Sequence, residues 1–347
     1  MYKVSLVLIV KNESRCIDRC LSSFRDYVDE IILIDTGSTD DTVQKAQKYG
    51  ALTYHSEWQN DFSFARNFAL DRSSGDWNVV VDADEWLISG AGALQELKAN
   101  DPEYVGIIAI ENQFGNGGQI QLSQFSLPRV LPSTVRYVGK IHEQPEHQLL
   151  TQRLGIVLGH DGYLGKQHIQ KRGRNELILR AELEISPEDA YLNYQLGKDL
   201  AIQENFQESI AFFEKARSRS SSQMIWRHDL IVRLLFSYKK EKIFSEGFDL
   251  ITNEEQHFTH SPDFYFCCGD FCIDAALYLP DHSQTLIPMI ESYFLKARAV
   301  GENSQIDDRV VGRGSFLAAY NLYAFYSSTG RDELAIQYLK LYEAEKI

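Results

Sequence analysis

The chain has 347 residues, of which 44% are hydrophobic, enough to build cores for two domains of roughly 100–200 residues each. It carries 35 lysines and arginines against 49 aspartates and glutamates, a formal net charge of −14 at pH 7. A field of that sign repels nucleic acid and anionic membranes, so we expect neither as a partner.

The cysteines and the first apolar run bear on the compartment. The cysteines are Cys16, Cys20, Cys267, Cys268 and Cys272. An odd number without zinc-site spacing predicts buried thiols rather than a disulfide framework or a zinc site. The run Val4–Val10 is far shorter than the ~20 apolar residues of a membrane span. No small-residue cleavage site follows it. The sequence therefore predicts a cytoplasmic protein without a membrane span.

The first third of the chain alternates short apolar runs with segments of helical spacing. The predicted strands are Val4–Val10, Ile31–Ile34 and Trp77–Val81. The predicted helices are 14–24 and 42–49. Asp40 is suited to cap the second helix and Gly50 to end it. This alternation is typical of a parallel sheet with helices on both faces.

Polar residues follow each of these strands, where open parallel sheets bind their ligands. Asn12 and Glu13 follow the first strand, Asp35 follows the second, and the sequence Asp82-Ala83-Asp84 follows the third. On an extended segment the two carboxylates of D-x-D share one side of the chain. Such a pair attracts Mg²⁺ or Mn²⁺, which keeps positions for water and phosphate oxygens. The pattern predicts a metal site that neutralises a departing diphosphate.

The rest of the chain changes from strands to helices. Residues 104–160 read as strands and loops, with a turn at Gly115–Gly118 and period-2 alternation in Gln119–Phe125 and Val135–Ile141. From Ile169 onward the spacing is helical. The clearest repeats, near 190–223 and 316–347, have the small and aromatic positions of tetratricopeptide (TPR) helices. We expect an α/β domain over 1–168 and an all-α helical-repeat domain over 169–347, whose stacked helices offer a surface to a partner chain.

Several motifs together resemble a known family. They are VSLVLIVKNES, IILIDTGSTDDT, DFSFARN and VVDADEW. Over roughly residues 1–165 the chain resembles the family 2 glycosyltransferases, which implies a GT-A fold, a Rossmann-like domain with a mostly parallel sheet. The segments Asp61–Asn67, Gly139–Glu143 and His160–Tyr163 are also similar to motifs of the sublancin-type bacterial peptide S-glycosyltransferases. Those enzymes join a GT-A domain to TPR-like helices.

The resemblance implies an inverting transfer from a UDP-sugar, with Mn²⁺ or Mg²⁺ as cofactor. Asp35 is expected to hold the uracil or ribose, and Asp82 the ribose or sugar. Asp84 and His160 are expected to bind the metal, and Glu143 to be the catalytic base that deprotonates the acceptor. The remaining expected nucleotide-sugar residues are Val10, Asn12, Glu13, Arg66, Ala83, Lys171 and Arg174.

Two of these assignments have a structural alternative. Lys171 and Arg174, in the basic run after the HDGY motif, are spaced to reach a diphosphate together or to form a solvated helix face. Arg66 is either a phosphate contact or a salt bridge that holds its helix to the sheet.

The acceptor follows less directly from the residues. We expect a peptide or protein Cys or Ser side chain, as in a bacteriocin-type precursor, recognised by the helical region. A glycan or lipid-linked saccharide is the alternative acceptor. The helices could instead join two subunits in a homodimer. A non-catalytic TPR adaptor would have lost the acidic motif, which this chain retains. A nucleotidyltransferase needs a glycine-rich loop after the first strand, and Lys11-Asn12-Glu13 stands there instead.

Overall fold

The computed structural model describes residues 1–346 except 115–120, 162–172, 304–305 and 307. The chain divides into two compact units, Met1–Lys171 and Arg172–Ile347. The turn expected at Gly115–Gly118 lies outside the described residues.

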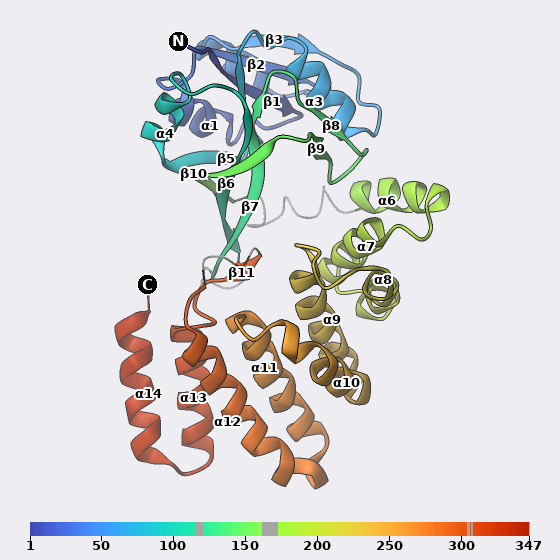
Figure 1. The fold of residues 1–347 in the computed structure, drawn as a ribbon, viewed down its shortest axis with the longest axis vertical. Helices are drawn as coiled ribbons and strands as arrows, with labels where there is room; N and C mark the ends of the chain where they lie inside the picture. The colour runs from blue at the N-terminus through green and yellow to red at the C-terminus, as the bar shows by residue number, and fades with distance from the viewer. Residues whose placement is uncertain (115–120, 162–172, 304–305, 307, 347) are drawn as a thin grey trace. The chain divides into compact units, whose positions relative to one another are not determined.

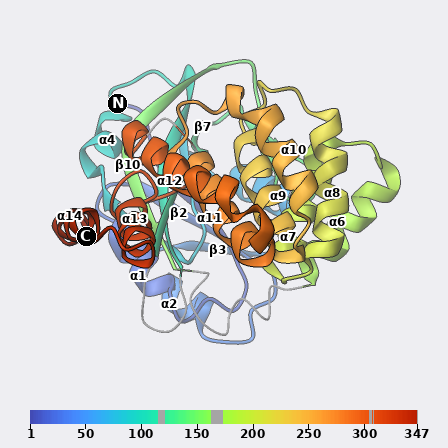
Figure 2. The same cartoon turned by 90° about the horizontal axis from the view of Figure 1, so that it is seen from below.

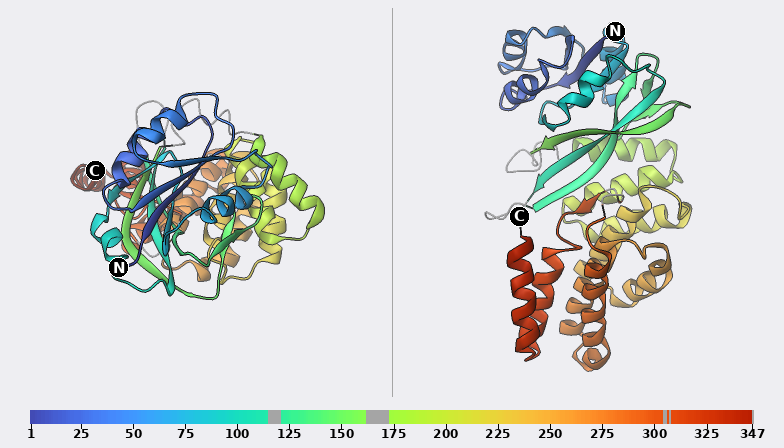
Figure 3. Two further views of the ribbon diagram at one scale, coloured as in Figure 1. Left: turned by 90° about the horizontal axis from the view of Figure 1, so that it is seen from above. Right: turned by 60° about the vertical axis from the view of Figure 1, so that its left-hand side comes forward.

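The first unit is built on one mixed sheet (Figure 1). Its strands, in sheet order, are β3 (Leu52–His55), β2 (Glu30–Asp35), β1 (Val4–Val10), β4 (Trp77–Val80), β7 (Gln121–Pro132), β6 (Tyr104–Phe114), β10 (Leu150–His160) and β5 (Glu85–Ser89). The first four strands are parallel to one another. β7 runs antiparallel to both β4 and β6, β10 is parallel to β6, and β5 is antiparallel to β10. Strands β6, β7 and β10 are the longest, drawn teal to green in the right-hand view of Figure 3.

Helices cover both faces of the parallel half of the sheet. They are α1 (Ile17–Phe24), α2 (Thr42–Lys48), α3 (Phe62–Leu70) and α4 (Ala91–Glu96). Figure 1 shows α1 and α4 on one side of the sheet and α3 on the other. Leu6 and Leu8 of β1 share a buried cluster with α1, whereas Val7 shares one with α3. Because β1 lies between two parallel strands and under two layers of helix, both of its faces are apolar. The α/β architecture expected from the alternating sequence is thus confirmed.

Two details complete this unit. β8 (Arg136–Val138) and β9 (Gln144–Glu146) form a separate antiparallel pair. The N-cap residue of α2 is Asp41 rather than Asp40, but the Asp40 carboxylate accepts the Thr42 backbone N–H at 3.0 Å. The expected capping side chain therefore satisfies the helix terminus from one position earlier.

All the long elements of the second unit are α-helices. These are α6 (Arg174–Ile185), α7 (Ala190–Ile202), α8 (Phe206–Arg219), α9 (Arg227–Glu241), α10 (Phe244–Glu254), α11 (Pro262–Tyr278), α12 (Ser283–Val300), α13 (Phe316–Ser328) and α14 (Asp332–Glu345). Figure 2 shows them following one another in chain order, with α6 at one side and α14 at the other. The all-α second region is thus confirmed. No helix in the described ranges is long and apolar enough to cross a membrane.

The small-and-aromatic positions of the repeat have a direct packing role. A Cβ placed on Gly197 of α7 would lie 2.6 Å from the Phe213 ring of α8. The glycine therefore lets an aromatic ring of the second helix of the hairpin lie against the backbone of the first. Phe213 and Leu196 are fully buried. This close approach is one of the packing contacts that join α7 to α8.

Candidate active site

The strand register brings the polar ends of β1, β2 and β4 to one edge of the sheet. Val10, buried at the end of β1, is level with Asp35 at the end of β2. On the other side, the Val81 N–H donates to the Val7 carbonyl, so the chain leaves β4 at the same edge. The segment Asp82-Ala83-Asp84 then turns directly into β5. The expected site residues on these three strand ends are therefore neighbours.

Glu85 shapes the turn that presents the acidic motif. Its Oε2 accepts the Asp82 backbone N–H at 2.8 Å, and its own N–H donates to the Asp82 carbonyl at 3.0 Å. The Glu85 side chain is buried, and burial raises its pKa. This carboxylate is thus used inside the protein, while Asp82 keeps 36% of its side chain exposed.

Two buried arginines hold Asp82 in place. Arg66 Nη2 donates to Asp82 Oδ1 at 2.8 Å, and Arg129 Nη2 donates to Asp82 Oδ2 at 2.8 Å. Arg129 also lies 3.4 Å from Glu85 Oε1. Burial alone would raise the pKa of Asp82, but the two guanidinium groups outweigh it and hold that pKa well below its ordinary value. Asp82 is therefore an oriented, ionised carboxylate at the edge of the site.

The DFSFARN motif places Glu143 beside this acidic edge. Asp61 caps α3 by accepting the Phe64 N–H at 2.8 Å. Asn67 of the same helix exchanges two hydrogen bonds with the Tyr137 backbone in β8, at 2.8 and 2.9 Å. One turn beyond β8, Glu143 accepts a hydrogen bond from Arg66 Nε through Oε1 at 2.5 Å. The guanidinium of Arg66 thus contacts both Glu143, the expected base, and Asp82.

Asp84 and His160 form the candidate metal site. Asp84 is buried, and its Oδ2 lies 3.4 Å from His160 Nε2 at the end of β10. The other ring nitrogen, Nδ1, hydrogen-bonds to Asn112 Oδ1 of β6. When the imidazole is neutral and Nδ1 donates in this contact, Nε2 presents its lone pair to a cation; when the imidazole is protonated, Nε2–H faces Asp84. Burial lowers the pKa of His160, but the hydrogen bond with Asp84 and the charges of Asp84, Glu85 and Asp82 raise it above its usual value.

This pair fits a hard divalent cation. Two ligands of one octahedral Mg²⁺ or Mn²⁺ ion, each about 2.1 Å from the metal, lie about 3 Å apart, close to the Asp84–His160 spacing. Such an ion takes one or two protein groups and fills its other positions with water and phosphate. Among the residues that the structure describes, no set of three or more His, Cys, Asp or Glu side chains is arranged to hold a metal. Asp84 and His160 would therefore supply two ligands to such an ion.

The loops after β1 and β2 hold each other. Thr39 donates its N–H to Asn12 Oδ1 at 2.7 Å, and the Asn12 N–H donates to Ser38 Oγ at 2.9 Å. Asp35 accepts the Ser38 N–H at 3.0 Å. The Glu13 N–H donates to Thr42 Oγ1 at 2.8 Å. Asn12 and Glu13 therefore shape the loop beside Asp35 through hydrogen bonds between backbone N–H groups and side-chain oxygens, and their role toward a nucleotide remains a prediction.

The basic run after the HDGY motif is only partly described. Lys171 lies outside the described residues. Arg174 begins α6 in the second unit, and its guanidinium lies 3.3 Å from Asn175 Oδ1. The contact expected between these two residues and a diphosphate stays a prediction.

Three residues that the sequence analysis did not assign complete the acidic edge. They are Glu85, Asn112 and Arg129. Asn112 follows the apolar run of β6, so it could have been found as another polar strand end. Arg129 is separated from Asp82 by 47 positions and faces it only because β7 pairs with β4. Its role could not be read from local pattern.

Asp161 ties the end of β10 to α1. It accepts hydrogen bonds from Arg15 at 3.2 Å and from Arg19 at 2.8 Å. The Arg19 guanidinium also lies over the Trp86 ring at 3.7 Å. Trp86 is therefore a packing residue here, and the salt bridges fix the strand end that carries His160.

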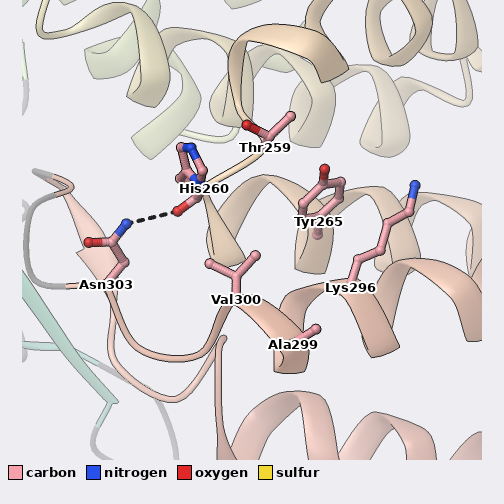
Figure 4. A pocket seen from close by; sticks show the side chains of 7 residues that line it. All are labelled: Thr259, His260, Tyr265, Lys296, Ala299, Val300 and Asn303. Atoms are coloured by element: carbon pink, nitrogen blue, oxygen red, sulfur yellow. Dashed lines mark hydrogen bonds between the residues drawn. The ribbon is translucent and has the colours of Figure 1, made fainter.

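A shallow cavity of about 520 Å³ lies on the helical unit (Figure 4). It is lined by Thr259, His260, Tyr265, Lys296, Ala299, Val300 and Asn303. Its polar groups serve the fold: Lys296 Nζ pairs with Glu255 at 2.7 Å, and Asn303 Nδ2 donates to the His260 carbonyl at 2.9 Å. The cavity contains none of the residues predicted for the active site.

Several known proteins resemble this chain in sequence. Residues 5–151 match glycosyl transferase family 2. The chain is 32% identical over 256 residues to a TPR repeat-containing protein of Synechococcus elongatus, covering 70% of this chain and 63% of that protein. It is 29% identical over 220 residues to the SPbeta prophage-derived glycosyltransferase SunS of Bacillus subtilis, covering 60% of this chain and 52% of SunS. The chain thus spans less than two thirds of the length of both relatives.

Among solved structures, glucosyl-3-phosphoglycerate synthase from Mycobacterium tuberculosis, in complex with Mn²⁺, UDP and glucosyl-3-phosphoglycerate, is 25% identical. The match covers 33% of this chain and 45% of that one, with a TM-score of 0.26. The similarity to glycosyl transferase family 2 therefore rests on the sequence matches. The chain thus contains, over residues 5–151, a domain that matches glycosyl transferase family 2, and TPR-like helices follow it.

Proposed function

We propose that this chain catalyses the metal-dependent, inverting transfer of a sugar from a UDP-sugar to an acceptor. The observation that carries the proposal is the gathering of Asp82, Asp84, His160 and Glu143 at the edge of the sheet where strands β1, β2 and β4 end. An acidic edge of this kind suits a nucleotide diphosphate only with a cation between them.

Each group has a separate task in this reaction. Asp84 and His160 would hold Mn²⁺ or Mg²⁺, which neutralises the charge that develops on the leaving diphosphate. Asp82, ionised and partly exposed, orients the ribose or sugar by accepting hydrogen bonds. Glu143 removes the proton of the attacking acceptor. Direct attack by the acceptor inverts the configuration at the anomeric carbon of the sugar, so no protein nucleophile is required.

For the acceptor we propose a Cys or Ser side chain of a peptide or protein. Support comes from the similarity of the DFSFARN, GKIHE and HDGY segments to the sublancin-type peptide S-glycosyltransferases and from the helical repeats, because stacked helical pairs offer an extended surface to a peptide. A thiol acceptor, with an ordinary pKa of about 8.5, needs little help from a base. Incubation with Cys- and Ser-containing peptides, followed by mass spectrometry, tests this part. Sugar addition to saccharides but to none of the peptides would refute it.

The donor half is tested by calorimetric titration of UDP with and without Mn²⁺. Wild type should bind UDP only with the metal, and Asp84→Asn should lose that binding. Asp26→Asn is the matched control, because Asp26 is exposed on the surface and pairs only loosely with Arg25 at 3.7 Å. Wild-type protein that fails to bind UDP with any divalent cation would refute the proposed donor.

A further inference from the structure

Five side chains at the acidic edge form one alternating chain of charges. They are, in order, Glu143, Arg66, Asp82, Arg129 and Glu85. Four of them have side chains at most 10% exposed, and only Asp82 opens to solvent at 36%. The order of these contacts makes Arg66 the link between the proposed base and the acidic motif.

The geometry of Arg66 is unusual for an arginine–carboxylate contact. Nε and Nη2 lie on one edge of the planar guanidinium, and such an edge commonly binds both oxygens of a single carboxylate. Here Nε donates to Glu143 and Nη2 donates to Asp82, so one edge serves two different carboxylates. The carboxylates of Glu143 and Asp82 would repel each other if the positively charged Arg66 did not lie between them. Arg66 therefore determines where the Glu143 carboxylate stands.

Arg129 fixes the other side of this arrangement. It holds the second oxygen of Asp82 at 2.8 Å and is itself anchored by buried Glu85. Asp82 is consequently held from both sides, and Arg66 cannot shift toward it without losing Glu143. A rigid acidic residue thus serves as the fixed point against which the proposed base is aligned.

We propose that Arg66 is a positioning residue that acts through Glu143, rather than a ligand of the donor diphosphate. This inference rests on the function proposed above. Two of its three guanidinium nitrogens are occupied by carboxylates. The third, Nη1, is buried and has no hydrogen-bond partner among the residues that the structure describes. A diphosphate contact would have to use Nη1 or the second N–H of Nη2 while both carboxylates stay bound, which gives the two roles different experimental signatures.

The informative substitution is Arg66→Lys. Lysine keeps the positive charge, but a single ammonium cannot present two N–H groups along one planar edge. Misplacing a catalytic group by about 1 Å costs roughly 10²-fold in rate, so kcat should fall by about that factor. The dissociation constant for UDP with Mn²⁺ should stay within about twofold of wild type, since the metal site and Asp82 remain.

The experiment is a double-mutant cycle of Arg66→Lys with Glu143→Gln. Release of UDP from UDP-glucose, UDP-galactose and UDP-N-acetylglucosamine with Mn²⁺ gives kcat and KM, and calorimetry gives UDP affinity. If Arg66 acts through Glu143, Arg66→Lys should lower kcat in the wild-type background and add almost nothing in the Glu143→Gln background. Arg72→Lys is the control. Arg72 follows the same helix, but it lies over the Phe68 ring and hydrogen-bonds to the Phe68 carbonyl.

Each contrary result has its own meaning. Additive losses in the double variant, or a tenfold weaker UDP affinity with unchanged kcat, would overturn the positioning role in favour of a diphosphate contact. Turnover of none of the UDP-sugars by wild type would overturn the proposed function itself. If Arg66→Lys does not fold, as judged by circular dichroism, the same cycle is run with Arg66→Gln. Glutamine presents one amide in place of the guanidinium edge and also removes the positive charge, so its loss of kcat should again be small in the Glu143→Gln background.

Discussion

Asp229 in the helical unit offers a measurable test of how buried charge stabilises the repeats. It lies on α9, 5% exposed, and its Oδ2 accepts hydrogen bonds from the Tyr194 hydroxyl at 2.6 Å and from Arg233 Nε at 2.5 Å. Lys198 Nζ is 3.5 Å away. Burial acts to raise the pKa of Asp229, but the charges of Arg233 and Lys198 outweigh it and lower that pKa. The substitution Asp229→Asn removes the charge and keeps the size.

The expected cost follows from these contacts. Removing one partner of a fully buried ion pair costs about 3–5 kcal/mol, because the other charge is left without compensation. Here Arg233 and Lys198 keep 32% and 24% of their side chains exposed, so water compensates part of the loss. Asparagine also still accepts the Tyr194 hydrogen bond. We therefore expect a loss of about 2–3 kcal/mol, or about 4–12 °C in Tm for a region of this size.

The assay is urea and thermal unfolding of the full chain, followed by circular dichroism between pH 3 and 7. A carboxylate with a lowered folded pKa stabilises the protein above its unfolded pKa of about 3.9 and loses that effect as the pH falls through the folded value. The gap between wild type and Asp229→Asn should therefore be full near pH 7 and shrink below about pH 4. Asp249→Asn, at an exposed position on α10, is the control and should change stability by less than about 0.5 kcal/mol. A gap under about 1 kcal/mol, or one that is constant with pH, would refute this reasoning.

Three further substitutions test the site and the repeat. Asn112→Ala removes the acceptor that orients His160 and should weaken Mn²⁺ binding by roughly 10–100-fold in calorimetry; unchanged affinity would remove its orienting role. Glu143→Gln should keep UDP affinity while transfer falls by roughly 10²-fold or more, and a normal rate would assign the base elsewhere. Gly197→Ala forces a methyl group against the Phe213 ring and should cost about 1–3 kcal/mol in urea unfolding; an unchanged midpoint would show that the helices separate freely.

Local pattern predicts the parallel half of the sheet well. The runs Val4–Val10 and Ile31–Ile34 and the run after Asp76 are apolar because both of their faces are covered, so composition alone marks them as central strands. The acidic residues at their ends follow from the same topology, since parallel strands finish at one edge. The helical region is also visible in the sequence, and some of its helix pairs carry a contact between a glycine and an aromatic ring, such as Gly197 with Phe213 and Gly269 with Phe294.

What local pattern does not predict is the pairing of distant segments. The chain runs β6 to β7 as a hairpin, yet β7 inserts beside β4, so Arg129 reaches Asp82 across 47 positions. Glu143 likewise meets Arg66 across 77 positions. The sequence motifs contain Glu143 and Arg66, but they do not show that the two side chains form an ion pair. That pair forms only when the segments that carry Arg66, Asp82 and Glu143 pack together. The sequence left two roles open for Arg66, a phosphate contact or a salt bridge, and the structure shows salt bridges with Asp82 and Glu143.

The buried cysteines have a consequence for chemistry carried out with this protein. All five are buried, and burial raises the pKa of every thiol, to about 11 for Cys267 and about 12 for Cys272. Since the thiolate is the nucleophile, we expect the five buried thiols of the folded chain to react slowly with alkylating agents at neutral pH. Maleimide or iodoacetamide added to a mixture of native protein and a cysteine peptide will therefore count the free thiols of the peptide alone. The rate at which that signal falls measures the rate of modification at sulfur, without purification of the product.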